Sequence, residues 1–350
     1  MFIKGIESDK SIKFCDPEDI RWMLAANITN ETPIITQFGS FSSSTNKAIG
    51  SALANNGKIY TGAFDRSSPV YLDPQTKETL GFGTSDVAAG KWVGAALHKN
   101  GYIYSAPYNK HSILRIDPNT NTTTTIGTSA TGTFGGILCH PNGKIYCIPW
   151  SNPNMFEFDP STNSIVTIPL TPSQWLGGCV HPNGKIYLVP YTANKILEFD
   201  PVTKTSVQYG SFVGSEKWTG AVVHPNGKIY MMPCNHASIL EFDPVTKISR
   251  LIGNLGTGTA KWLCAAVAPN GKIYAPPANH TSILEFDPLN DSLNLLGNFG
   301  STVVKWNSIT LAPSGKLYCI PRTALYNLEI DTLHVPQRSD ICLSLYYNKL

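Results

Sequence analysis

The sequence predicts an all-β fold: a seven-bladed β-propeller of four-stranded antiparallel blades, whose ring is closed by the N-terminal strand. Three observations support this prediction. A block of about 40–45 residues recurs seven times, which is the period of a propeller blade. Turn-forming residues stand at fixed places inside each block, and a copy of the last missing strand lies near the N-terminus.

The repeat is marked by a glycine that opens the block Gly-Lys-Ile-Tyr or a close variant. These glycines lie 41 to 44 residues apart, and an aspartate follows each of them sixteen residues later. The glycines are Gly57, Gly101, Gly143, Gly184, Gly227, Gly271 and Gly315, and the aspartates are Asp73, Asp117, Asp159, Asp200, Asp243, Asp287 and Asp331. One internal spacing in seven copies indicates seven equivalent units.

The fifth copy shows how a unit is built. Its runs 218–223, 228–232, 239–242 and 248–252 predict four strands, here called a to d. Between strands a and b, Pro225 presets φ and Gly227 can adopt a positive φ, which favours a tight turn. Between strands c and d, the Asp243 side chain can accept backbone N–H groups. Such short links leave no room for crossover helices, so a parallel α/β fold is excluded.

The seventh copy lacks its strand d, and the N-terminal region supplies one. Residues 37–41 match residues 208–212, which lie in strand d of the fourth copy. Residues 33–40 are therefore predicted to complete the seventh blade beside residues 316–331, which removes an exposed sheet edge. The predicted domains are an N-terminal extension 1–32 with a short helix after Asp16, the propeller 33–331, and a C-terminal tail 332–350.

The Pro-Asn-Gly-Lys-Ile-Tyr … Asp-Pro repeat resembles those of propeller families in the broad kelch, SMP-30 and NHL-like neighbourhood. The resemblance covers residues 33–331 and implies the fold, whereas propellers host unrelated activities. Similarity to SMP-30 lactonases would imply a divalent cation held by carboxylate and amide groups at the axis. The predicted inner strands offer Asn307 as their lone amide, and hard cations need several oxygen ligands. A non-catalytic module without metal or cofactor is favoured over a metal-dependent hydrolase.

Composition excludes several classes of partner. The net charge of +3 is too small to predict nucleic-acid or membrane-surface binding, and no apolar run is long enough to span a bilayer. No signal peptide is evident, and the eight cysteines form no Cys-x-x-Cys pair, so a cytoplasmic or virion-associated protein is expected. Apolar residues in both tails predict assembly with other chains: Trp22, Met23, Leu24, Leu343, Leu345, Tyr346 and Tyr347. An alternative function is that of a structural component of a virion or phage tail.

In a four-stranded meander, the a–b and c–d turns lie on one face of the ring, here called the turn face. The repeated histidines of blades two to five lie there: His98, His140, His181 and His224. Turn capping is favoured over metal ligation, because turns of neighbouring blades are too far apart to share an ion. The repeated Tyr of strand b and Trp of strand a are expected to pack between blades rather than to bind a ligand.

The b–c loops and d–a links form the opposite face, here called the loop face, and this face varies in chemistry. Five lysines precede the repeated tryptophan position: Lys47, Lys91, Lys217, Lys261 and Lys305. Aromatic residues follow strand b in blades one to four: Phe64, Tyr108, Trp150 and Tyr191. Amides and imidazoles come next along the loops: Asn109, Asn235, Asn279, His236 and His280.

These loop-face residues predict a binding site, because function is often carried by variable loops on a rigid scaffold. The lysines are expected to form a broken, electropositive ring around the channel entrance, which would attract an oppositely charged ligand. The aromatic residues would stack on sugars or clamp a peptide, and the amides would donate hydrogen bonds. The candidate partners are a glycan, an anionic small molecule or a protein loop. Alternatively, each lysine stem covers its neighbouring tryptophan and holds its ammonium group in water.

Overall fold

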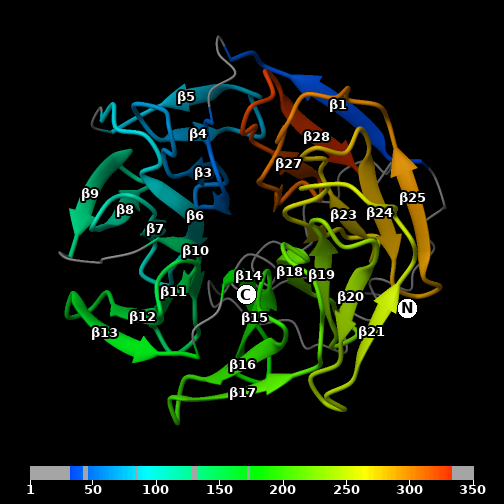
Figure 1. The fold of residues 1–350 in the computed structure, drawn as a ribbon. Helices are drawn as coiled ribbons and strands as arrows, with labels where there is room; N and C mark the ends of the chain where they lie inside the picture. The colour runs from blue at the N-terminus through cyan, green and yellow to red at the C-terminus, as the bar shows by residue number, and fades with distance from the viewer. Residues whose placement is uncertain (1–31, 42–45, 84–85, 128–132, 172–173, 333–350) are drawn as a thin grey trace, which may run out of the picture.

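Seven four-stranded antiparallel sheets surround a central axis (Figure 1), as the sequence predicts. The structure is a computed structural model, and it describes residues 32–41, 46–83, 86–127, 133–171 and 174–332. The helix expected after Asp16 and the apolar tail residues lie outside these ranges. The described residues contain no helix of a length and apolarity that would let it cross a membrane.

The first four blades follow one another along the chain. Blade 1 consists of β2 (Ala52–Leu53), β3 (Ile59–Thr61), β4 (Val70–Leu72) and β5 (Thr79–Gly81). Blade 2 consists of β6 (Trp92–Leu97), β7 (Ile103–Pro107), β8 (Ile113–Asp117) and β9 (Thr122–Ile126). Blade 3 consists of β10 (Phe134–Cys139), β11 (Ile145–Pro149), β12 (Asn154–Asp159) and β13 (Ser164–Pro169). Blade 4 consists of β14 (Trp175–Val180), β15 (Ile186–Pro190), β16 (Ile196–Asp200) and β17 (Thr205–Tyr209).

The last three blades complete the ring. Blade 5 consists of β18 (Trp218–Val223), β19 (Ile229–Pro233), β20 (Ile239–Phe242) and β21 (Ser249–Ile252), close to the predicted bounds. Blade 6 consists of β22 (Ala266–Val267), β23 (Ile273–Ala275), β24 (Ile283–Asp287) and β25 (Ser292–Leu296). Blade 7 consists of β26 (Thr310–Leu311), β27 (Leu317–Cys319), β28 (Asn327–Asp331) and, from the N-terminal side, β1 (Ile34–Phe38).

The predicted ring closure is confirmed. β1 pairs antiparallel with β28, from Ile34 opposite Asp331 to Phe38 opposite Asn327. Figure 1 shows the blue β1 lying along the red β28. The side chain of Phe38 reaches the strand-b tyrosine Tyr318, with ring centroids 6.2 Å apart in an edge-to-face arrangement. Residues from the two ends of the chain thus share one blade and one core cluster.

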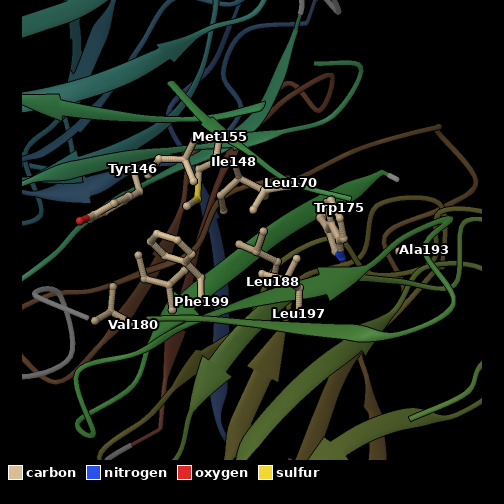
Figure 2. Packing of buried hydrophobic residues seen from close by; sticks show 12 residues of the cluster. Tyr146, Ile148, Met155, Leu170, Trp175, Val180, Leu188, Ala193, Leu197 and Phe199 are labelled. Atoms are coloured by element: carbon tan, nitrogen blue, oxygen red, sulfur yellow. The ribbon is translucent and has the colours of Figure 1, made fainter. Parts of the chain in front are cut away.

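Apolar side chains of neighbouring blades interlock to form the core. Between blades 3 and 4, Tyr146 packs against Phe199 with ring centroids 5.9 Å apart, and Met155 lies in the same cluster (Figure 2). The repeated tyrosines and tryptophans are buried, which confirms the expected packing role. The inner strands approach one another closely at the axis. A Cβ added at Gly50 would meet the Gly94 Cα at 2.7 Å, so only glycine fits there.

The turn-face histidines cap their turns, as expected, and also join the blades. In blade 4, His181 Nδ1 accepts the Asn183 backbone N–H at 3.2 Å, and His181 Nε2 lies 3.0 Å from the Gly227 carbonyl of blade 5. The Nε2–H tautomer satisfies both bonds. The same pair of contacts recurs at His98, His140 and His224. These four residues clip blades 2 to 5 each to the following blade.

Buried glutamates on strand c form a second set of links between blades. Glu198 accepts a hydrogen bond from the Tyr187 hydroxyl at 2.9 Å and forms ion pairs with Lys185 of its own blade and Lys247 of blade 5. Lys247 stands in the c–d turn with φ of 62°, a left-handed conformation that the sequence did not reveal at a lysine. Because the charges are paired and hydrogen-bonded, their burial is tolerated.

Candidate functional site

The four loop-face aromatic residues form a continuous arc across blades 1 to 4. Ring centroids lie 5.2 Å apart for Phe64 and Tyr108, 5.5 Å for Tyr108 and Trp150, and 6.4 Å for Trp150 and Tyr191. Tyr108, Trp150 and Tyr191 are half-buried, and Phe64 is buried. We call this set the aromatic arc. The rings hold one another in place, and three of them keep part of their surface open to solvent.

The sequence places Arg322, Cys234 and Ala278 at the equivalent positions of the other three blades. Arg322 extends the arc, because its guanidinium lies over the Phe64 ring, 5.7 Å from the ring centroid. Cys234 and Ala278 are small and fully covered, so the row of large side chains is interrupted at blades 5 and 6. The sequence analysis did not include Arg322 among the candidate site residues, although it occupies the same position of the repeat as the four aromatic residues.

The expectation of solvent-facing lysines is wrong. Lys47, Lys91, Lys217, Lys261 and Lys305 each have 3% or less of their surface exposed. Neither an open ring of charges around the channel nor ammonium groups held in water describes them. Each side chain turns inward, because backbone carbonyls of the preceding blade, as for Lys47, of the link between the two blades, as for Lys305, or of both, as for Lys91, offer it acceptors.

The lysines act as internal staples of the loop face. Lys91 Nζ donates to the Arg66 carbonyl in the b–c loop of blade 1 at 2.7 Å. Lys261 Nζ donates to the His236 carbonyl in the b–c loop of blade 5 at 2.9 Å. Burial lowers the pKa of all five ammonium groups, and burial together with Arg66 lowers the pKa of Lys47 to about 8. The other acceptors include the carbonyls of Ala324 for Lys47, Gly214 for Lys217 and Thr302 for Lys305.

The backbone along this face is also bonded from blade to blade. Lys91 N–H donates to the Phe64 carbonyl at 3.0 Å, and Tyr108 N–H donates to the Lys91 carbonyl at 2.9 Å. The pattern recurs at the other lysine positions, for example from Lys261 N–H to the Cys234 carbonyl at 2.9 Å. The staples and this circuit of backbone bonds make the loop face a rigid platform.

The amide row is engaged with its own chain. Asn235 Oδ1 accepts the Ala260 N–H at 2.7 Å, and Asn279 Oδ1 accepts the Val304 N–H at 2.7 Å. Asn109 is exposed and makes a weak contact with the Ala89 carbonyl at 3.4 Å. These amides tie each b–c loop to the next link, so the structure gives them a positioning role that the sequence analysis did not foresee.

The two loop-face histidines lie against tryptophans. The His236 ring is 4.3 Å from Trp218 between centroids, and the His280 ring is 4.4 Å from Trp262. In each case Nδ1 accepts a backbone N–H two residues later, at 3.0 Å. Burial lowers the pKa of both imidazoles, which keeps them neutral near pH 7. Both rings therefore cover tryptophans at blades 5 and 6, where the arc is interrupted.

The two ends of the arc differ in their polar neighbours. Arg322 lies at the blade 7 end, while burial together with Cys234 and Glu216 raises the pKa of Tyr191 at the blade 4 end.

A small cavity of about 170 Å³ lies on the axis, lined largely by glycine and aliphatic residues of the inner strands. In the described ranges no group of three or more His, Cys, Asp or Glu side chains is placed to share a metal ion.

Comparisons with known proteins give a fold and a repeat. Residues 26–159 match a family described as a repeat of unknown function (DUF6923). No curated protein sequence matches the chain. A virginiamycin B lyase from Staphylococcus aureus, in a catalytically inactive form with quinupristin, has a TM-score of 0.75 at 9% identity, over 86% of this chain and 99% of that one.

Two further solved structures are similar. A streptogramin B lyase has a TM-score of 0.74 at 12% identity, over 85% of this chain and 97% of that one. The extracellular domain of a hybrid two-component system from B. thetaiotaomicron has a TM-score of 0.66 at 12% identity, over 88% of this chain and 44% of that one. At these identities the likeness shows the fold alone: this chain is a seven-bladed propeller of repeats, part of which match a repeat family of unknown function.

Proposed function

We propose that this protein is a non-catalytic binding module that holds a carbohydrate against the aromatic arc on its loop face. The observation that carries the proposal is the unbroken contact of four aromatic rings across four blades, three of them half-buried. Aromatic side chains of this kind offer a flat apolar surface together with a polar edge, which suits a partner that is apolar on its ring faces and polar at its rim.

Hydrogen-bond donors on the arc support a ligand rich in hydroxyl groups. Within the described residues, the Tyr108 hydroxyl and the Trp150 indole N–H have no hydrogen-bond partner. An extended peptide is a poorer fit, because strand addition needs unpaired backbone groups. The backbone beside the arc is already bonded from blade to blade, as at Phe64, Lys91 and Tyr108.

The likeness in fold to solved propellers is consistent with the proposal. The virginiamycin B lyase, a propeller of similar fold, has a solved structure with quinupristin, so a ring of this kind holds a ligand in that protein. We also propose that the repeat is related to those of kelch, SMP-30 and NHL-like propellers. The protein is proposed to act in the cytoplasm or on a virion. A role in a larger assembly is the second candidate and is tested separately below.

A glycan array with the purified full-length protein tests the function. For any binder found, Tyr108→Ala and Trp150→Ala should each lower the affinity roughly thirtyfold or more, the effect of removing an aromatic hot-spot residue. Tyr102→Ala is the matched control, since Tyr102 is a half-buried tyrosine beneath Arg115 at the start of strand b, toward the turn face. The proposal fails if no glycan binds, or if binding survives both arc substitutions with an unchanged melting temperature.

A further inference from the structure

A fixed guanidinium lies at the end of the aromatic arc. Arg322 Nε donates to Asn46 Oδ1 at 2.9 Å, and Asn46 Nδ2 donates in turn to Asp65 Oδ2 at 2.8 Å. Asp65 Oδ1 accepts the Gly90 backbone N–H at 2.7 Å. Both carboxylate oxygens of Asp65 are thereby occupied, and Arg322 is oriented through an amide instead of being neutralised in a direct ion pair.

The terminal nitrogens of this guanidinium are available. Among the described residues, Nη1 and Nη2 of Arg322 have no hydrogen-bond or ion-pair partner. A guanidinium presents these donors in a planar fork that matches the two oxygens of a carboxylate. The nearest ring is Phe64 of the arc, and the Arg322 charge also acts on the Tyr108 hydroxyl. A ligand on the arc would therefore meet this fork at its blade 7 end.

The surrounding sector has an excess of positive charge. Lys47 and Arg66 lie on blade 1 beside the same junction, where Lys47 Nζ and the Arg66 guanidinium are 5.3 and 5.6 Å from the Phe41 ring centroid. The Arg66 Nε is buried without a hydrogen-bond partner. Burial lowers the pKa of Arg66 and of Arg322, which means that both cations are held at an energetic cost that a nearby anion would reduce.

From this placement we infer that the arc takes an acidic carbohydrate, one whose sugar carries a carboxylate, as uronic and sialic acids do. The carboxylate pairs with Nη1 and Nη2 of Arg322, which lies over the buried Phe64 ring, while the sugar rings lie along Tyr108 and Trp150. This inference rests on the proposed carbohydrate site and adds its charge specificity. Asp65 offsets one of the three positive charges of this sector, and a carboxylate, which carries a single charge, is the anion that the Arg322 fork is expected to hold.

Matched acidic and neutral probes test the inference. Binding of the full-length protein is measured by quenching of tryptophan fluorescence or by calorimetry, for tri-galacturonate against its methyl ester and for sialyllactose against lactose. We expect at least one acid to bind about tenfold or more tightly than its neutral counterpart, the range of a charge-assisted hydrogen-bonded pair. The preference should weaken as salt is raised.

The arginine variants separate charge from geometry. Arg322→Gln should abolish the preference for the acid and leave the weaker neutral binding intact, and Arg322→Lys should restore only part of it, because a lysine offers a point charge without the fork. The matched control is Arg115→Gln, where Arg115 lies over Tyr102 toward the other face, 4.8 Å from the ring centroid. Melting temperatures of all variants identify any that fail to fold.

Each outcome decides between the two proposals. Equal binding of acid and ester, unchanged by Arg322→Gln, overturns the charge specificity and leaves the carbohydrate site standing. Stronger binding of a sulfated or phosphorylated sugar than of any carboxylated one also overturns it. Absence of binding by every acidic and neutral probe overturns the proposed function and this inference together.

Discussion

Charged side chains of the loop face are used as internal connectors. Lys91 and its four counterparts bring ammonium groups into the interior and satisfy them with carbonyl oxygens of the preceding blade and the link between blades. A buried ammonium is tolerated only when it is well hydrogen-bonded, and its loss leaves the acceptors unpaired. The repeated lysine is therefore explained by packing of loop against blade.

Replacing one staple should lower stability without touching the arc. In Lys91→Met the stem remains, but the Arg66 carbonyl loses its donor. We expect a loss of about 2 kcal/mol in the free energy of unfolding, the cost of an unsatisfied buried acceptor. Urea titration measures it, and Lys195→Met serves as the control because Lys195 is exposed. Equal midpoints for the two variants would contradict the staple.

The histidine clips make stability depend on pH. His224 Nδ1 accepts the Asn226 N–H at 3.1 Å, and its Nε2 lies 2.8 Å from the Gly271 carbonyl. Protonation would place a second N–H against the Asn226 N–H, and burial already lowers the pKa of His224 below its ordinary value of about 6.5. The unfolded chain then takes up the proton first, so the stabilisation is present above about pH 6.5 and is lost on acidification.

His224→Ala is the natural variant for this measurement, because alanine stands at the same position in blades 1, 6 and 7, as Ala54, Ala268 and Ala312. The stability difference between the wild-type protein and this variant should be largest near pH 7.5 and shrink toward pH 5.5. Subtraction removes the titration of every other group. A gap that stays constant or widens on acidification would refute the assignment.

At the residue scale the sequence predicted which side chains pack in the core, but it did not predict which polar side chains of the loop face are open to solvent. Burial of Tyr146 and Trp175 follows from their place in the repeat. The direction of the lysine side chains could not be predicted, because one acceptor of Lys91, Lys217 and Lys261 lies 25 residues earlier in the preceding blade's b–c loop, as the Arg66 carbonyl does for Lys91. Periodicity carries no information on where that loop carbonyl points. Arg322 was overlooked since it breaks the aromatic pattern of its row.

At the scale of elements, β1 is the strand on which ring closure depends. It pairs with β28 over five residues, from Ile34 opposite Asp331 to Phe38 opposite Asn327, and Ile35 packs against the core cluster between blades 6 and 7. Its identity could be predicted because its sequence repeats that of another strand d. The predicted split into 1–32, 33–331 and 332–350 stays a prediction.

Deletion of residues 1–40 should prevent stable folding, because β28 would lose its partner and blade 7 would expose an unpaired edge. Deletion of residues 1–32 spares β1 and should be far milder. Thermal melting and limited proteolysis of the two truncated proteins give the comparison. A melting temperature of the 1–40 deletion equal to that of the full chain would show that another segment closes the ring.

At the scale of the whole molecule the ring is uneven. Blades 2 to 5 have inner strands of six residues and histidine clips, whereas β2, β22 and β26 of blades 1, 6 and 7 have two residues each. The four rings of the arc, from Phe64 to Tyr191, lie on blades 1 to 4, and Arg322 lies on blade 7. The proposed site therefore spans both parts of the ring.

The apolar tail residues predict assembly with other chains, a proposal separate from the carbohydrate site. Full-length protein should form larger species than a truncated protein of residues 33–331 in multi-angle light scattering, because segments rich in apolar residues favour association. The truncated protein should keep the same glycan binding as the full chain. If both are monomeric and neither captures a partner in pull-downs, the assembly proposal is abandoned.

The pairing of β1 with β28 also has a consequence for chain connectivity. Ile34 and Asp331 are register partners, so the first and last strands of the ring begin and end side by side at one rim. In the other blades a short c–d turn joins these two positions, as from Asp243 to Ser249 in blade 5. A turn of that kind could join residues 331 and 34 directly. New ends could then be opened in another c–d turn, giving a circular permutant with the same seven blades.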